Sequence, residues 1–166
     1  MPVKLLFLDV DGVLNYDRCK YSVGIYYGVD PEKVKLLRKI IDATGAKIVL
    51  SSTWRRSILV GMPLELQEDP FAIELMSKLK AEGLKIYDMT SVDENDGHRK
   101  EQIEELIAEY RQNGQPVSHW CVLDDDIFEG FDEPEFNQHF VNTKFYENGL
   151  SEEDVQKAIE ILNGGA

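Results

Sequence analysis

The sequence is poor in the residues that most often bind transition metals or form covalent cross-links. It has only two cysteines in 166 residues, Cys19 and Cys121, and no CxxC pair. Its histidines, His98, His119 and His139, are not spaced as metal ligands, and we assign them no role. A chain of this length can fold around its own hydrophobic core. A disulfide framework is therefore not expected, and a zinc site lacks suitably spaced ligands.

Positive charge is also scarce. Lys and Arg number 18 against 31 Asp and Glu, which gives a net charge of −13. This excess disfavours a broad footprint on nucleic acid or on an anionic membrane, because both would repel the protein. A few local cations can still hold a phosphorylated small molecule or a nucleic-acid end. We therefore expect a phosphorylated substrate, no extended nucleic-acid binding and no membrane partner.

Long hydrophobic runs, internal repeats and low-complexity segments are absent from the sequence. The apolar run near the N-terminus is short and is interrupted by Asp9 and Asp11. This pattern fits neither a signal peptide nor a transmembrane helix, and we expect a cytoplasmic protein. No linker separates two apolar cores, so residues 1–166 are predicted to form a single domain.

What the chain does have is an alternation of strand-like and helix-like segments. The continuous apolar run Val3–Leu8 is typical of a strand covered on both faces. The predicted strands are 3–8, 47–51, 84–89, 119–123 and 139–142, and the predicted helices begin at Pro31, Pro70, Lys100 and after Ser151. Such alternation predicts an α/β fold, namely a Rossmann-like domain with a mainly parallel central sheet and helices on both faces.

Two carboxylates follow the first predicted strand at once. Asp9 and Asp11 are two residues apart, so their side chains point the same way while the chain stays extended, and Gly12 then allows a sharp turn. Two like charges about 4 Å apart repel by roughly 4 kcal/mol at an effective dielectric constant of about 20. A cation or a shared proton between them would relieve that repulsion.

Three further polar groups occur at strand ends or at the start of a helix. Ser51-Ser52-Thr53 follows the second strand, His98-Arg99-Lys100 opens a helix, and Asp124-Asp125-Asp126 follows the fourth strand. Each group alone is common in turns, helix caps and solvated helix starts. Ligands of parallel sheets, however, bind outside the carboxyl ends of the strands. The joint occurrence of these groups at that edge therefore predicts a functional site.

In this order the motifs resemble those of haloacid-dehalogenase-like (HAD) phosphatases of the small-cap or capless type. The resemblance rests on residues 9–14, Ser51, the pair Arg99-Lys100 and the pair Asp124-Asp125. A closer likeness, to the HAD domains of RNA-repair proteins, rests on residues 50–55, 123–126 and 149–151.

The resemblance implies a phosphatase that works through a covalent intermediate. Asp9 would attack phosphorus, and Asp11 would protonate the leaving alkoxide and then deprotonate the hydrolytic water. Ser51 would donate a hydrogen bond to the phosphoryl oxygens. Lys100 or Arg99 would neutralise charge, and we favour Lys100 because Ile103 lies one helical turn behind it.

The resemblance also implies a Mg²⁺ cofactor, because an all-oxygen ligand set together with a phosphate suits that ion. The expected metal ligands are Asp9, Asp125 and Asp124, with the main-chain carbonyl of Asp11. Which of Asp124 and Asp125 is the principal ligand stays open. The residues expected to contact the substrate are Gly12, Ser52 and Arg55.

Substrate selection would fall to a short flap, because no insertion is long enough for a large cap. Residues 15–29 contain four tyrosines and resemble a hairpin that either packs at an edge or contacts the ligand. Trp54 either stacks on a base or is buried. An open site of this kind suits a nucleotide or a nucleic-acid terminus.

The expected function is therefore Mg²⁺-dependent hydrolysis of a phosphate monoester through an aspartyl-phosphate. Three alternatives stay open: a phosphotransferase of the same family, a receiver-like signalling domain that binds phosphate and metal, and a non-catalytic phosphate-binding module. A receiver is disfavoured because its acid pair is consecutive after the first strand, whereas here the consecutive acids come late.

Overall fold

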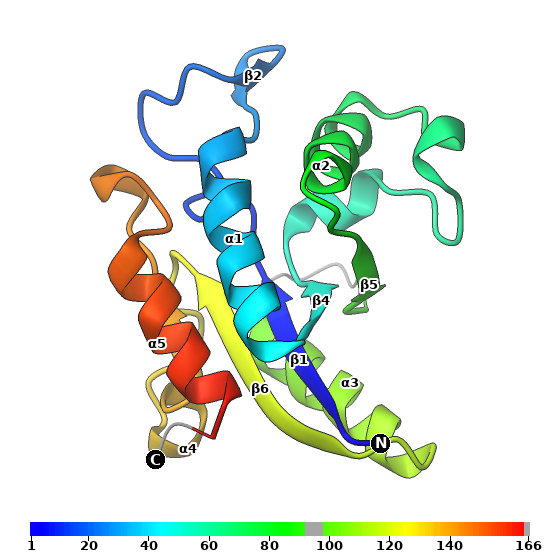
Figure 1. Cartoon of the computed structure of the whole chain (residues 1–166), viewed down its shortest axis with the longest axis vertical. Coiled ribbons are helices and arrows are strands. Elements are labelled where there is room, and N and C mark those ends of the chain that lie inside the picture. The colour runs from blue at the N-terminus through cyan, green and yellow to red at the C-terminus, as the bar shows by residue number, and fades with distance from the viewer. Residues whose placement is uncertain (92–97, 165–166) are drawn as a thin grey trace.

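A five-stranded sheet forms the centre of the protein (Figure 1). The computed structural model describes residues 1–91 and 98–164. The strand order is β5-β4-β1-β6-β7, and every neighbouring pair is parallel. The strands are β1 (Val3–Leu8), β4 (Lys47–Leu50), β5 (Ile86–Met89), β6 (Val117–Asp124) and β7 (Phe140–Asn142). The predicted α/β class with a parallel sheet is confirmed.

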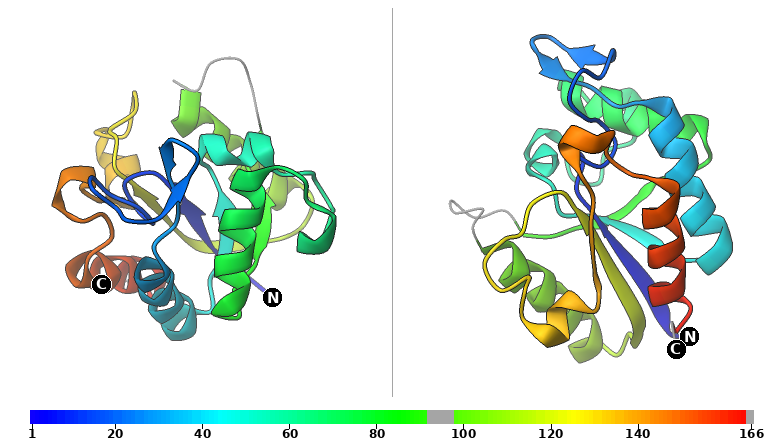
Figure 2. Two further views of the ribbon diagram at one scale, coloured as in Figure 1. Left: turned by 90° about the horizontal axis from the view of Figure 1, so that it is seen from above. Right: turned by 90° about the vertical axis from the view of Figure 1, so that its left-hand side faces the viewer.

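Helices cover both faces of this sheet, as predicted (Figure 2). On one face lie α1 (Pro31–Thr44), α2 (Pro70–Ala81) and α5 (Glu152–Leu162), and on the other lie α3 (Arg99–Gln112) and the short α4 (Pro134–Asn137). Side chains of β1 alternate between the two resulting cores. Leu6 and Leu8 join the core under α1, whereas Leu5 and Phe7 join the core under α3, and all four are fully buried.

The helix starts follow the capping signals in the sequence. Asp30 and Asp69 accept backbone N–H groups at the starts of α1 and α2, each followed by a proline. Ser151 forms a capping box with Asp154 at the start of α5. These caps fix where each helix begins, and thereby how the preceding loop leaves the carboxyl edge of the sheet.

A short hairpin projects above that edge (Figure 1). Its antiparallel strands are β2 (Ser22–Val23) and β3 (Tyr26–Tyr27), within the predicted flap 15–29. Its base is held by α2, because Glu74 Oε2 accepts the N–H of Val29 at 2.9 Å and Lys78 Nζ donates to the Val29 carbonyl at 2.6 Å. The side chain of Ile25 at the tip is 93% exposed. No large cap is present among the residues that the structure describes.

Element bounds differ from the predictions by a few residues. Strand β5 begins at Ile86 rather than at residue 84, and β6 begins at Val117 rather than at residue 119. Helix α4 and the 3₁₀ segments Thr53–Ser57, Leu64–Leu66 and Phe145–Glu147 were not predicted. They are too short for a hydrophobic period to show in the sequence. None of the helices in the described part of the chain has both the length and the apolarity needed to cross a bilayer.

The turn that precedes α5 closes against the loop that follows β1. The N–H of Leu150 donates to the carbonyl of Val13 at 3.0 Å, and Gly149 adopts φ +64°. A Cβ atom on Gly149 would lie 2.8 Å from the carbonyl oxygen of Asn15 and 3.0 Å from that of Val13. Glycine is therefore needed here both for its dihedral angle and for the close approach of two backbones.

We predict that Gly149→Ala destabilises the fold more than Gly45→Ala does. Gly45 has a similar φ of +72°, but a Cβ atom there would meet nothing within 4 Å. Gly45→Ala should cost about 1 to 2 kcal/mol for the left-handed conformation alone. Gly149→Ala should cost at least about 1 kcal/mol more, because the backbone must also shift. Urea denaturation followed by tryptophan fluorescence measures both losses, and equal losses would contradict this account of the turn.

Candidate active site

The register of the sheet brings three sequence-predicted residues side by side. Leu8 of β1 pairs with Leu50 of β4 and with Leu123 of β6. The next residue along each chain segment is Asp9, Ser51 or Asp124, and these three positions lie side by side at the carboxyl edge of the sheet, Asp124 being the last residue of β6. Backbone hydrogen bonds continue across this row, since Asp9 N–H donates to the Leu123 carbonyl at 3.0 Å and Ser51 N–H to the Leu8 carbonyl at 2.9 Å.

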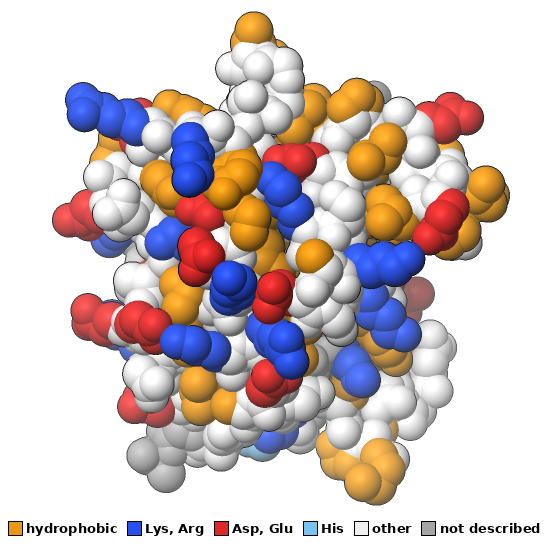
Figure 3. Space-filling model, turned by 45° about the horizontal axis from the view of Figure 1, so that its top comes forward, with side chains coloured by type: hydrophobic (Ala, Val, Ile, Leu, Met, Phe, Trp, Pro, Cys, Tyr) orange, Lys and Arg blue, Asp and Glu red, His pale blue; other side chains and the backbone are white. Residues whose placement is uncertain are grey.

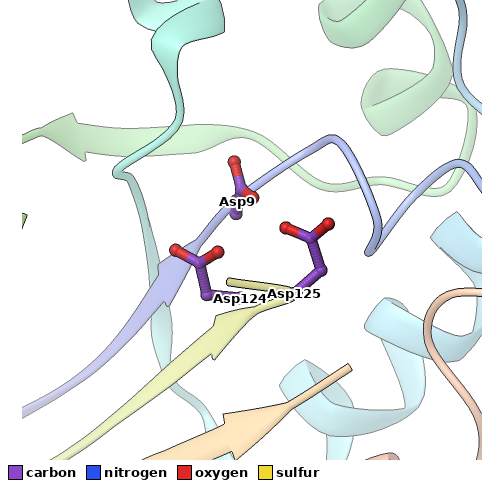
Figure 4. A group of neighbouring side chains, drawn as sticks. All are labelled: Asp9, Asp124 and Asp125. Atoms are coloured by element: carbon purple, nitrogen blue, oxygen red, sulfur yellow. The ribbon is translucent and has the colours of Figure 1, made fainter. Parts of the chain in front are cut away.

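Three carboxylates converge beyond that row (Figure 4). Asp9, Asp124 and Asp125 each offer one oxygen, and these oxygens all lie within 4.8 Å of one another. Asp9 and Asp124 are buried and Asp125 is half-buried. A group of oxygen ligands at this spacing is suited to a hard divalent cation such as Mg²⁺. Asp124 and Asp125, the two candidates for the principal metal ligand after β6, therefore face the same space.

Crowding and burial perturb all three acids in one direction. Burial raises the pKa of Asp9 well above its usual value, and the neighbouring Asp124 raises it further, while Arg99 opposes the shift. Burial also raises the pKa of Asp124, again against the effect of Arg99. The pKa of Asp125 rises to about 6 through burial and the charge of Asp124. A bound cation would favour the ionised form of all three acids, so a metal would stabilise the group.

Arg99 is the cation that the structure places against these acids. Its Nη1 atom lies 2.8 Å from Asp124 Oδ2 and 3.5 Å from Asp9 Oδ1, and its side chain is 4% exposed. Lys100 instead pairs with Glu104 at 2.8 Å and with Glu133 at 3.4 Å. The expectation that Lys100 reaches the acids is wrong. Adjacent helical residues point about 100° apart, so only one of the pair can face the site.

Ser51 presents a buried hydroxyl without a protein partner. Its Oγ atom makes no hydrogen bond to any residue in the ranges 1–91 and 98–164, although the residue is fully buried. Buried hydroxyls are nearly always hydrogen-bonded, so an unpartnered one beside Asp9 fits a ligand oxygen. Ser52 differs, because its Oγ accepts the N–H of Trp54 at 3.2 Å and caps the following 3₁₀ segment. This capping bond gives the Ser52 hydroxyl a structural role that needs no contact with a substrate.

Gly12 makes room for the acids. It adopts φ +80°, and a Cβ atom there would lie 2.3 Å from Asp125 Cγ. Its N–H already donates to Asn15 Oδ1 at 3.0 Å. The expected contact between Gly12 and the substrate stays a prediction, while glycine is required here by the close approach of the loop after β1 to Asp125.

Arg55 does not face the open side of the site. Its side chain is buried, with 2% of the residue exposed, and Nη1 donates to the carbonyls of Ser51 at 3.2 Å and Ser52 at 2.6 Å. Nη2 donates to Gln102 Oε1 at 3.2 Å. The expectation that Arg55 binds substrate is wrong, because its guanidinium instead ties the loop after β4 to α3.

Asp11 stands apart from the three-carboxylate group and is exposed. Asn15 Nδ2 donates to its Oδ1 at 2.8 Å, and the indole Nε1 of Trp54 donates to its Oδ2 at 3.1 Å. Trp54 itself is 6% exposed and packs edge-to-face on Phe71. Of the two interpretations of Trp54, burial is therefore the one that the structure shows.

Two residues at the carboxyl end of β7, its last residue Asn142 and the following Thr143, were missed by the sequence analysis. Thr143 Oγ1 donates to the Gly12 carbonyl at 2.7 Å, and Asn142 Nδ2 donates to the Asp125 carbonyl at 3.1 Å. Together they connect the loop after β1, which carries Gly12, to the loop after β6, which carries Asp125. The sequence pattern did place Asn142 and Thr143 at the carboxyl end of a predicted strand, as it did the other site residues. They were overlooked because neither side chain is a usual catalytic group.

A comparison with known families gives one match. The family model described as "HAD domain in Swiss Army Knife RNA repair proteins" matches residues 5–155. This range includes all four acidic, hydroxyl and basic motifs and the turn around Gly149. No curated protein and no solved structure matches the chain.

We predict that Asp125→Asn stabilises the protein in the absence of divalent cations and weakens its response to Mg²⁺. The substitution removes one of three crowded charges, so the midpoint temperature in a chelator should rise. The apparent Mg²⁺ affinity, measured by calorimetry, should fall about tenfold or more with the lost ligand charge.

The matched control is Asp126→Asn. Asp126 is the adjacent acid, is exposed and lies outside the group of three. Its variant should keep both the midpoint temperature and the Mg²⁺ affinity of the parent chain. Equal effects of the two substitutions would contradict the assignment of the metal site to Asp9, Asp124 and Asp125.

Proposed function

The chain belongs to the family of HAD domains found in Swiss Army Knife RNA repair proteins, and on this premise we propose that it is a Mg²⁺-dependent phosphatase that hydrolyses a phosphate monoester through an aspartyl-phosphate. The observation that carries the proposal is the environment of Asp9. This buried carboxylate lies beside Arg99 and two further acids, at the end of a strand that pairs with the strand before Ser51.

In the first step Asp9 is the nucleophile. One of its carboxylate oxygens forms a bond to phosphorus while the bond from phosphorus to the leaving oxygen breaks. Asp11 gives its proton to that leaving oxygen, so an alcohol departs rather than an alkoxide. This need for a proton distinguishes phosphate esters from halides, whose leaving group needs none, and it supports a phosphatase over a dehalogenase.

In the second step water releases the phosphate. Asp11, now ionised, accepts a proton from the water as the water oxygen bonds to phosphorus, and the bond to Asp9 breaks. The Ser51 hydroxyl donates to a phosphoryl oxygen. The Arg99 guanidinium stabilises negative charge at Asp9 and favours the ionised form of the buried Asp124.

A Mg²⁺ ion, when bound, would draw the phosphate to Asp9 and neutralise its oxygens. Asp9, Asp124 and Asp125 would supply carboxylate ligands, and the main-chain carbonyl of Asp11 would complete the protein's share. The oxygen-only donor set and the 4.8 Å spacing support this assignment.

The proposed substrate is a nucleotide or the terminal phosphate of a nucleic acid. The name of the family refers to RNA repair, and the flap is small enough to leave the site open. On the face shown in Figure 3, Lys and Arg side chains are largely interspersed with Asp and Glu, which does not suit a long nucleic-acid track. Two buried, unpaired cysteines fit the proposed location in the reducing cytoplasm.

Water access favours hydrolysis over transfer of the phosphoryl group to a second substrate. A phosphotransferase would need a lid that excludes water from the aspartyl-phosphate. Above the edge of the sheet, the described residues provide a hairpin of two two-residue strands and no larger cover. We therefore propose water as the acceptor.

We predict that the chain hydrolyses p-nitrophenyl phosphate only in the presence of Mg²⁺ and that Asp9→Asn abolishes this activity. The substitution removes the nucleophile and one ligand charge, but its amide has nearly the same shape. Circular dichroism and thermal unfolding should show an intact fold. Activity of Asp9→Asn close to that of the parent chain would refute the mechanism.

A second test compares substitutions of Arg99 with a substitution of the adjacent Lys100. Arg99→Ala should lower kcat/KM by about 10²- to 10³-fold, as expected for the loss of one preorganised charge at the reacting groups. Arg99→Lys should restore part of the loss because it returns the positive charge. Lys100→Ala should stay within about twofold of the parent, since its partners are Glu104 and Glu133. The opposite ranking would assign the role to Lys100.

A further inference from the structure

The carboxylate of Asp11 is held by N–H donors from two different segments of the chain. Asn15 donates to Oδ1 from the start of the flap, and Trp54 donates to Oδ2 from the loop after β4. We propose that Trp54, assisted by Asn15, is a positioning residue that fixes Asp11 for proton transfer to the leaving group. This inference rests on the proposed phosphatase function and adds residues that the four motifs do not contain.

Asn15 cannot turn away from Asp11 without losing several bonds. Its Nδ2 atom also donates to the Gly28 carbonyl at 2.9 Å, and its Oδ1 atom accepts the Gly12 N–H at 3.0 Å. The residue is fully buried. Because both ends of the amide are in use, Asn15 sets the orientation of one oxygen of Asp11 and ties it to both ends of the flap.

The side chain and the backbone of Trp54 are also held in place by neighbouring residues. Its ring meets that of Phe71 edge-to-face, with centroids 5.0 Å apart and an interplanar angle of 84°. Its backbone N–H donates to Ser52 Oγ, which holds the first turn of the 3₁₀ segment. The indole N–H can therefore reach little besides Asp11 Oδ2, at 3.1 Å. The Trp54 side chain thus acts as a rigid donor and not as a platform for a base.

Asp11 is held by two N–H donors, one on each of its carboxyl oxygens. Among residues 1–91 and 98–164, Asp11 makes no ion pair, in contrast to Asp9 and Asp124, which share Arg99. With one donor on each oxygen, the plane of the Asp11 carboxyl group is set by hydrogen-bond geometry. Each carboxyl oxygen also keeps a second lone pair for the proton.

A purely structural role for Trp54 is the alternative, because a buried ring on Phe71 also stabilises the fold. Trp54→Phe separates the two roles. It keeps an aromatic ring against Phe71 and removes only the indole N–H. Trp120→Phe is the matched control, since the ring of Trp120 stacks on His139 at 3.7 Å between ring centroids and packs against Phe136.

The kinetic test compares kcat/KM across esters that differ in their need for a proton. This parameter reports the step in which the leaving group departs, and it is measured for p-nitrophenyl, phenyl and simple alkyl phosphates with Mg²⁺. For Trp54→Phe we expect at least about a tenfold loss on the alkyl ester, because general acid catalysis supplies roughly 10²- to 10⁴-fold and depends on orientation. On p-nitrophenyl phosphate the loss should stay within about threefold.

A second measurement does not depend on turnover. The two tryptophans give two indole N–H signals in a ¹⁵N-correlated NMR spectrum, and Trp54→Phe assigns them. Asp11→Asn should shift the Trp54 signal, speed its hydrogen exchange and leave the Trp120 signal in place. An unmoved Trp54 signal would overturn the proposed contact, whatever the activity.

The outcomes separate this inference from the function on which it rests. A parent chain that is active, together with a Trp54→Phe variant that loses activity equally on all esters or on none, overturns the positioning role alone. A parent chain without Mg²⁺-dependent turnover overturns the proposed function, and the positioning role for acid catalysis falls with it.

Discussion

The rest of the structure depends on the placement of three crowded carboxylates, two of them buried, at the carboxyl edge of the sheet. Asp9, Asp124 and Asp125 lie within 4.8 Å of one another through their oxygens, and the described residues bring one guanidinium, that of Arg99, against them. One positive charge cannot neutralise three negative ones: burial raises the pKa of all three acids, and repulsion from neighbouring acids raises that of Asp9 and Asp125 further. The fold holds these acids together because their loops are anchored elsewhere. That leaves an excess of negative charge suited to a divalent cation and a phosphate.

The anchors are mostly neutral hydrogen bonds and close backbone contacts. Thr143 and Asn142 link the loops after β1, β6 and β7, and Gly149 allows the turn before α5 to approach the first of them. Asn15 and Trp54 act in the same way on Asp11. Such contacts do not screen the acids, so the site keeps its charge while its geometry is fixed. This division between anchoring residues and charged residues is what electrostatic preorganisation requires.

The sequence predicted the parts of the site that follow from the strand pattern. Asp9, Ser51 and Asp124 are neighbours because each stands at the carboxyl end of a parallel strand, and strand ends can be located from apolar runs alone. The choice between Arg99 and Lys100 depends on how α3 is rotated against the sheet, and a one-residue difference moves a side chain by about 100°. Whether Arg55 and Trp54 are buried or face the site depends on how the loop after β4 packs, and no local sequence pattern encodes that packing. Asn142 was overlooked because its role lies in a tertiary contact to the loop after β6.

The measurement that tests the account most directly is chemical identification of the phosphorylated residue. The chain is mixed with a phosphate monoester and Mg²⁺, quenched in acid, reduced with borohydride, which converts an acyl phosphate to an alcohol, and analysed by peptide mass spectrometry. The account predicts that Asp9 alone is converted to homoserine, and only when Mg²⁺ is present. Steady turnover with Asp9 unmodified, or with the label on Asp124 or Asp125, would contradict it.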